Sequence, residues 1–161
     1  MLRTPGFVRD MKSGEEGAVD ALLRAAFETD AEARLVDRLR KTKVVAGESV
    51  MPMGDDIVGY FALSRMLQPK GWLALAPVAI HPDVQGRGYG KRMLGMLTVW
   101  ARLSSTPVVV LGDPKFYEAS GFSSKAAANL SSPYPVEFTL LCGVDGPPSA
   151  ELRYPNAFEG V

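Results

Sequence analysis

Residues 86 to 92, GRGYGKR, place three glycines at alternate positions and then two cations, Lys91 and Arg92. An apolar run follows, so this stretch lies where a helix is expected to begin. Glycine is a poor helix former, but at a turn it allows backbone N–H groups to approach a bound anion closely. Cations in a first helical turn oppose the helix dipole unless something negative is bound there. The pattern therefore favours a phosphate-binding turn over a flexible surface turn with solvated side chains.

The spacing of these glycines disfavours two common nucleotide-binding loops. A Walker A loop ends in Gly-Lys-Ser/Thr, whereas Arg92 follows Gly90 and Lys91 here. The dinucleotide fingerprint is G-x-G-x-x-G, whereas this turn reads G-x-G-x-G and comes late in the chain. Binding of ATP or NAD through either loop is therefore a minor alternative.

The elements around the turn form a strand–helix–strand unit. Residues 72 to 80, WLALAPVAI, are almost all apolar, which suits a central strand with both faces covered. Pro77 has no N–H to donate to a neighbouring strand, so we expect a β-bulge near it. A helix is predicted over residues 90 to 103, with Met93, Leu94, Leu97, Trp100 and Ala101 at helical spacing, and a buried strand over residues 108 to 112.

The rest of the chain alternates in the same way. Ser13 and Glu16 have the spacing of a capping box at the start of a helix. We expect strands over residues 2–9, 44–51, 57–65 and 137–142, and helices over residues 13–27, 31–40 and 115–120, the last ending at Gly121.

Two segments resemble one protein family, the GNAT N-acetyltransferase superfamily. Residues 85 to 90, QGRGYG, match its Q/R-x-x-G-x-G/A signature, and VVVLGDPKFYEASGF is similar to its fifth strand and next helix. The motifs YPVEF and YPNAF resemble a bacterial subgroup of predicted N-acetyltransferases. The resemblance implies a single domain over residues 1–161 with an α+β (α/β/α layered) fold. Its mixed central sheet would have a splayed fourth and fifth strand and helices on both faces.

The resemblance also implies a cosubstrate, acetyl-CoA, whose pantetheine arm would enter the cleft between the splayed strands. Free backbone groups of the bulged strand would pair with the pantetheine amides, the glycine turn would hold the pyrophosphate, and Lys91 or Arg92 would reach an outer phosphate. The residues implied in binding are Val78, Ala79, Ile80, Gln85, Gly86, Arg87, Gly88, Tyr89, Gly90, Lys91, Asp113 and Tyr117.

The implied reaction is acetyl transfer to a primary amine. Such an amine is protonated at neutral pH, so a base should remove its proton. Asp113, Glu32, His81 and a chain of water molecules all remain candidates for that base. Tyr117 matches the family residue that donates to the leaving thiolate, as a phenol can. A catalytically silent module that binds acyl-CoA is the alternative of a different class.

Composition excludes several partners and leaves the acceptor open. Lys plus Arg and Asp plus Glu number 18 each, so no overall field favours nucleic acid or a membrane. Cys142 is the only cysteine and the chain has one histidine, so no metal site is expected. A cytoplasmic protein and a possible homodimer are predicted. The first two helices and residues 129 to 138 should shape the acceptor site, with Tyr134 as a candidate lining residue.

Overall fold

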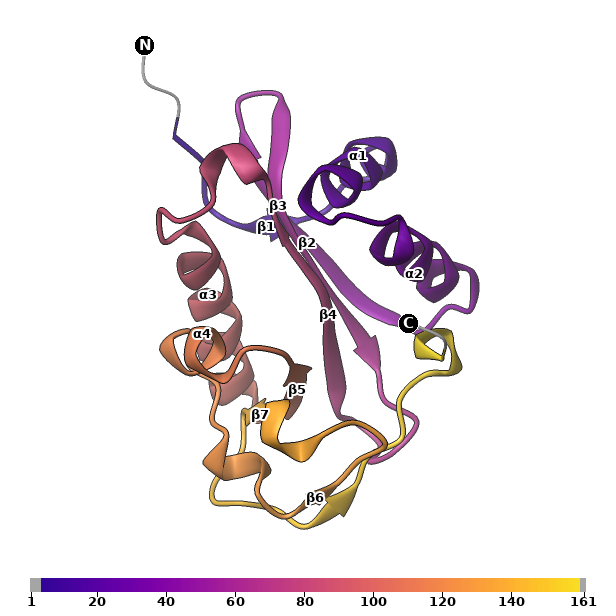
Figure 1. Cartoon of the computed structure of the whole chain (residues 1–161), viewed down its shortest axis with the longest axis vertical. Coiled ribbons are helices and arrows are strands. Elements are labelled where there is room, and N and C mark those ends of the chain that lie inside the picture. The colour runs from indigo at the N-terminus through magenta and orange to yellow at the C-terminus, as the bar shows by residue number, and fades with distance from the viewer. Residues whose placement is uncertain (1–3, 160–161) are drawn as a thin grey trace.

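The computed structural model describes residues 4–159, which form one main sheet with helices on both sides (Figure 1). The helices are α1 (Glu16–Ala26), α2 (Ala31–Lys41), α3 (Tyr89–Ser104) and α4 (Pro114–Ala119). The strands of the sheet are β1 (Arg9–Asp10), β2 (Val45–Met53), β3 (Asp56–Arg65), β4 (Leu73–Ile80), β5 (Val108–Leu111) and β7 (Thr139–Cys142).

The sheet is mixed, with the order β1-β2-β3-β4-β5-β7. Only β4 and β5 are parallel, and α3 makes the crossover between them. Helices α1 and α2 cover one face, while α3 and α4 lie on the other (Figure 1). One apolar cluster joins α1 and α2 to the sheet through Leu23, Val36 and Tyr60. Another joins α3 to the opposite face through Met93 and Leu97.

The expected bulge is present in β4. Phe61 of β3 pairs with Val78, but Leu63, two residues further along β3, pairs with Leu75, three residues back along β4. Strand β4 therefore has one extra residue, which forms a bulge beside Pro77. A bulge suits this position because proline has no backbone N–H to donate to the neighbouring strand.

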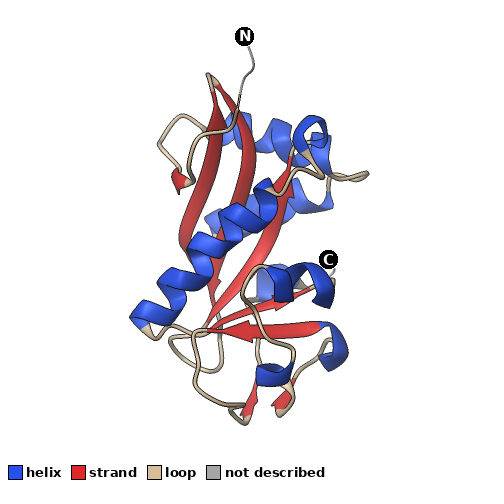
Figure 2. Ribbon diagram, turned by 90° about the vertical axis from the view of Figure 1, so that its left-hand side faces the viewer, coloured by secondary structure: helices blue, strands red, loops and turns tan. Residues whose placement is uncertain are grey.

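Beyond the bulge, β4 and β5 separate. Their parallel pairing runs from Leu73 opposite Val108 to Leu75 opposite Val110, and stops there. Figure 2, seen from the side of α3, shows the long strands diverging from the short pair β5 and β7. The second half of β4 thus has β3 on one edge and no strand on the other.

The C-terminal part of the chain lies past the end of the sheet at the bottom of Figure 1. Strands β6 (Leu130–Ser131) and β8 (Ala150–Glu151) form a separate parallel pair. The chain then runs back to α2, where it forms the 3-10 helix η4 (Asn156–Phe158) (Figure 1). Two further 3-10 turns, η1 (Pro82–Val84) and η3 (Val136–Phe138), precede α3 and β7.

Several sequence expectations are wrong at the N-terminal end. Of the strand expected over residues 2–9, residues 2 and 3 lie outside the described residues, and in the remainder β1 covers only Arg9–Asp10, because Pro5 and Gly6 are poor strand residues. The capping box is also absent. The Glu16 carboxylate accepts from the N–H of Gly14, which has a positive φ of 97°, and the helix begins after Glu15 without a side-chain cap.

Two other expectations need correction. The strand expected over residues 137–142 is shorter, because η3 occupies its first residues and β7 begins at Thr139. Trp100, expected on the buried face of α3, is 46% exposed, while Leu97 and Ala101 of that face are buried. Cys142 is buried, as its small apolar character suggests. In the described part of the chain, no helix is both long and apolar enough to span a membrane.

Candidate active site

A cleft of about 280 Å³ opens where β4 and β5 separate. Residues 74 to 78 of β4 form one wall, and Val109, Leu111 and Tyr117 form the other. Phe27, Glu32 and Leu35 border the cleft from the region of α1 and α2. Tyr134, Tyr154 and Phe158 complete it from the C-terminal part of the chain. The splayed strands thus create a mainly apolar cavity with few polar groups.

The open edge of β4 offers backbone groups to a ligand. The N–H of His81 donates to the carbonyl of Val58 in β3, at 2.8 Å. Successive residues of a strand direct their polar groups to opposite edges, so Ala79 also faces β3 while Val78 and Ile80 face the open edge. The side-chain amide of Gln85 donates to the Ile80 carbonyl at 2.8 Å. The N–H and carbonyl of Val78 and the N–H of Ile80 therefore remain for a ligand.

The glycine turn is prepared for an anion. Gly86 and Gly88 have φ values of 77° and 83°, in the left-handed region that favours glycine, and Gly88 is the N-cap of α3. Among the described residues, no protein group accepts a hydrogen bond from the N–H groups of residues 86 to 91. The first intrahelical bond is donated by Arg92 to the Gly88 carbonyl. A helix N-terminus with unpaired N–H groups and no acidic residue in its first turn attracts anions.

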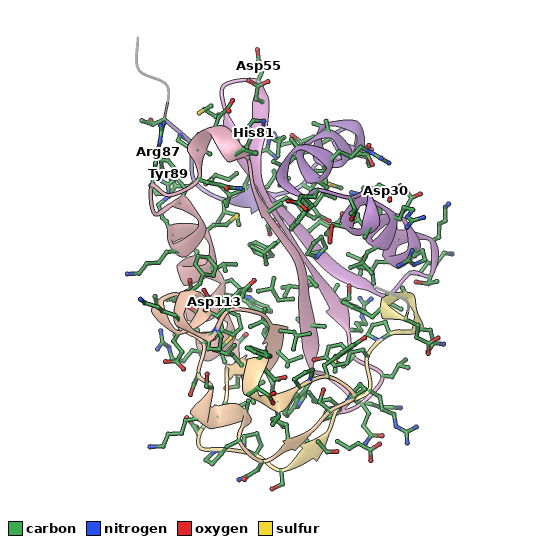
Figure 3. All side chains as sticks on the ribbon, viewed as in Figure 1. Asp30, Asp55, His81, Arg87, Tyr89 and Asp113 are labelled. Carbon is green, nitrogen blue, oxygen red and sulfur yellow. The ribbon has the colours of Figure 1, made fainter. Side chains whose placement is uncertain are left out.

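The cations of the turn have different surroundings. Arg87 and Lys91 are exposed, and Figure 3 shows Arg87 beside Tyr89 at the outer end of α3. Arg92 instead donates to the carbonyls of Pro5 and Gly6 and lies over the Tyr89 ring, 5.0 Å from its centroid. Of Lys91 and Arg92, Lys91 is therefore better placed to contact an outer phosphate, because Arg92 already bonds to the N-terminal segment.

Close packing fixes the Tyr117 ring at the cleft. A Cβ on Gly112 would lie only 2.6 Å from Cε2 of Tyr117, so the ring packs directly on the Gly112 backbone. Phe116 and Phe122 make edge contacts with the ring, with centroids at 5.0 and 5.8 Å. Burial, and then the charge of Asp113, raises the pKa of Tyr117 to about 12. The phenol therefore keeps its proton at neutral pH and can act as a donor.

The three candidate bases lie in different places. The Asp113 carboxylate is exposed and caps α4, accepting from the N–H of Lys115 at 3.1 Å. His81 accepts from the N–H of Asp83 through Nδ1, and shares a separate cavity with Asp55 at the hairpin end of the sheet (Figure 3). Only Glu32 of the three lines the cleft together with Tyr117.

Comparison with known proteins identifies the family. A model of the acetyltransferase (GNAT) domain matches residues 40–124, which is more than half of the chain. The chain belongs to the GNAT acetyltransferase family.

Relatives of this GNAT protein cover most of its length. It is 33% identical over 122 residues to the uncharacterized N-acetyltransferase YhbS of Escherichia coli (strain K12), with 73% of each chain aligned. The crystal structure of Escherichia coli YhbS in complex with CoA has a TM-score of 0.83 at 25% identity, covering 98% of this chain and 93% of that one. These matches confirm the expected fold.

A second solved structure agrees in fold. A GNAT family acetyltransferase from Brucella melitensis in complex with acetyl-CoA has a TM-score of 0.78 at 23% identity. The alignment covers 94% of this chain and 97% of that chain.

Sequence reasoning missed part of this GNAT cleft. Phe27, Leu35, Tyr154 and Phe158 reach it, although none of them was a candidate. The motif YPNAF, residues 154 to 158, contains two of these side chains and was noticed only as a family resemblance. Nothing in its spacing indicates that the chain end returns to the cleft, since that depends on tertiary structure.

Proposed function

We propose that this protein transfers an acetyl group from acetyl-CoA to the primary amine of an acceptor. The observation that carries the proposal is the continuity of the open β4 edge with the unpaired N–H groups of residues 86 to 91. Acetyl-CoA has matching parts, because its pantetheine contains amides and its pyrophosphate is an anion. The CoA and acetyl-CoA complexes of the Escherichia coli and Brucella melitensis proteins support the same ligand here.

The proposed binding mode follows from these unpaired groups. The N–H groups of residues 86 to 91 bind the pyrophosphate, and Lys91 contacts an outer phosphate. The pantetheine amides pair with Val78 and Ile80 along the open edge, which directs the thioester toward the cleft. Gln85 shapes this path through its bond to the Ile80 carbonyl, and Ala79 holds the strand to β3.

In the proposed reaction, residues that line the cleft move the protons. Glu32 takes a proton from the acceptor ammonium, directly or through water, and the freed lone pair attacks the thioester carbon. The Val78 N–H stabilises the oxyanion that forms. The attached nitrogen then loses a second proton to solvent as the amide forms. When the carbon–sulfur bond breaks, Tyr117 donates its proton to the leaving thiolate. Solvent returns a proton to the phenol, and Glu32 releases to solvent the proton that it took from the ammonium.

Calorimetry and single-turnover kinetics test this proposal. The purified protein should bind acetyl-CoA, and mixing with a primary amine should release free CoA thiol. Tyr117→Phe should still bind acetyl-CoA but transfer acetyl about 100-fold more slowly. Glu32→Gln should bind acetyl-CoA equally well and lose rate most at low pH, where less amine is deprotonated in solution.

Three results would count against the proposal. Absence of any binding heat with acetyl-CoA would overturn it as a whole. Binding without transfer to any amine would favour the silent binding module instead. Equal transfer rates for Tyr117→Phe and the unaltered protein would remove the phenol from the mechanism.

A further inference from the structure

Three aromatic side chains, Tyr134, Tyr154 and Phe158, line the cleft and also a second cavity of about 570 Å³. This second cavity, called the outer chamber below, lies between residues 131–134 and 151–159. The Tyr134 and Tyr154 rings meet edge to face with centroids 5.0 Å apart, and the Tyr154 and Phe158 centroids are 5.6 Å apart. The aromatic cluster therefore stands at the junction between the outer chamber and the cleft.

The Tyr154 hydroxyl is the unusual polar group at this junction. Its oxygen is buried and has no hydrogen-bond partner of good geometry within the described residues, although the Ser132 side chain lies close enough for a weak hydrogen bond that lowers its pKa. Burial nevertheless dominates and raises the pKa of Tyr154 to about 12, so the hydroxyl keeps its proton. Buried polar groups are almost always paired in folded proteins. A ligand at the junction would supply the missing partner.

The charges that line the cleft favour a single ammonium group. Glu32 lines the cleft, and no other carboxylate among the described residues does so. In the outer chamber, Arg153 pairs with Glu151 at 3.2 Å, and Glu159 is the other carboxylate on the lining. Aromatic faces attract an ammonium ion, and beside them the cleft offers the single carboxylate of Glu32 to pair with it.

The wall that carries Tyr154 is fastened to the rest of the protein before any ligand binds. Arg153 exchanges backbone hydrogen bonds with Gln68 at 2.9 and 3.1 Å. The N–H of Leu152 donates to the Ser131 carbonyl at 2.7 Å, and Arg38 of α2 donates to the Ala157 carbonyl. A pre-formed wall loses little conformational entropy on binding and can select ligands by shape.

We propose that the aromatic junction and the outer chamber form the acceptor subsite, and that the acceptor is a small primary monoamine. Its carbon chain next to the nitrogen is apolar or aromatic and lies between the rings, while its far end is polar and occupies the outer chamber. The Tyr154 hydroxyl hydrogen-bonds to this ligand. The inference rests on the proposed function, because it concerns the second substrate of that reaction.

Steady-state kinetics at saturating acetyl-CoA test it with tyramine, 2-phenylethylamine, spermidine and a lysine-containing peptide with a blocked N-terminus. Both aromatic amines should exceed spermidine and the peptide in kcat/KM by about tenfold or more. In Tyr154→Phe, the KM for tyramine should rise about tenfold through loss of one hydrogen bond. The KM for acetyl-CoA should not change.

Ser124→Ala is the matched control, because its hydroxyl is also buried without a partner but lines neither cavity. Both variants should melt at or above the temperature of the unaltered protein, and Ser124→Ala should keep the KM for tyramine. A merely structural Tyr154 would give the same melting result with no change in that KM.

The failures of the two proposals are distinguishable. A preference for spermidine or the peptide, transfer to neither aromatic amine, or an unchanged tyramine KM in Tyr154→Phe would overturn this inference while acetyl-CoA binding stands. A protein that binds no acetyl-CoA in calorimetry overturns the proposed function and this inference with it.

Discussion

At the residue scale, Gly112 determines where the phenol of Tyr117 can lie. Any side chain at this position would need a Cβ 2.6 Å from the Tyr117 ring, closer than atoms can approach. Gly112→Ala should therefore displace the ring, lower the melting temperature and reduce the rate of acetyl transfer about tenfold or more, because a small misplacement of a donor is costly. Thermal unfolding and single-turnover kinetics measure the two effects.

Gly17 provides the control for this substitution. It lies in α1 with no atom within 4 Å of its would-be Cβ. Gly17→Ala should stabilise the protein by about 0.5–1 kcal/mol, since alanine is the better helix former, and should not alter the rate. If Gly112→Ala behaved like Gly17→Ala, the ring would not depend on the glycine.

The glycine turn could be recognised at this scale as a candidate anion site because its sequence signal is local. Alternating glycines, Lys91 and Arg92 are visible in seven consecutive residues, and the turn precedes α3 as expected, while phosphate binding by the turn stays a prediction. Glu32 and Tyr154 could not be assigned in the same way. They are distant in sequence, and only the packing of α2 and the chain end brings them to one cleft.

At the element scale, α2 holds the C-terminal wall through Arg38. Its guanidinium donates twice to the carbonyl of Ala157 in η4, at 3.2 and 3.1 Å. Arg38→Ala should loosen this attachment, increase amide hydrogen exchange across residues 154 to 159, and raise the KM for the acceptor. Hydrogen-exchange mass spectrometry and steady-state kinetics measure these changes.

Arg34 serves as the comparison, because it lies on the same helix but forms an exposed pair with Asp30. Arg34→Ala should leave both measurements unchanged, as exposed pairs contribute little. Equal exchange in the two variants would show that the wall is held by its strand pairings alone.

A helix, strand or bulge could be predicted from the sequence only where neighbouring residues indicate it. The bulge in β4 was predicted because a proline inside an apolar run cannot donate to a ladder, and the register confirms it. The start of α1 was predicted wrongly, because the positive φ of Gly14 turns the chain and the first helical residue is Glu16. Strands β6 and β8 have two residues each, too few for any periodicity.

At the scale of the whole molecule, the backbone pairing between β4 and β5 is incomplete. Strand β4 lies between β3 and β5, yet only its first half is paired on both edges. The apolar clusters on the two sheet faces hold the remainder in place, so that an open strand edge persists without unfolding. A homodimer and a cytoplasmic location stay predictions, as neither follows from this architecture.

The protonation of groups whose pKa changes on folding makes the stability of the whole chain depend on pH. The hydrogen bond from Arg9, and then that from the Lys12 N–H, lowers the pKa of Glu15 from 4.5 to about 2. This contribution is present above pH 4.5 and is lost as pH falls toward 2. At the alkaline end, burial raises the pKa of Tyr117 and Tyr154 from 10.0 to about 12, and that of Cys142 from 9.0 to about 12.

At alkaline pH, the direction in which the free energy of unfolding changes depends on whether the folded or the unfolded chain loses its protons first. Between pH 9 and 12 the unfolded chain releases these protons while the folded chain retains them, so the free energy of unfolding falls as pH rises. The urea midpoint should therefore decline from about pH 9 upward. Cys142→Ala should start from a lower midpoint but begin its decline nearer pH 10, where the tyrosines ionise in the unfolded chain. A midpoint that stayed constant from about pH 9 to about pH 11 would mean that these groups are hydrated in the folded protein, contrary to their burial.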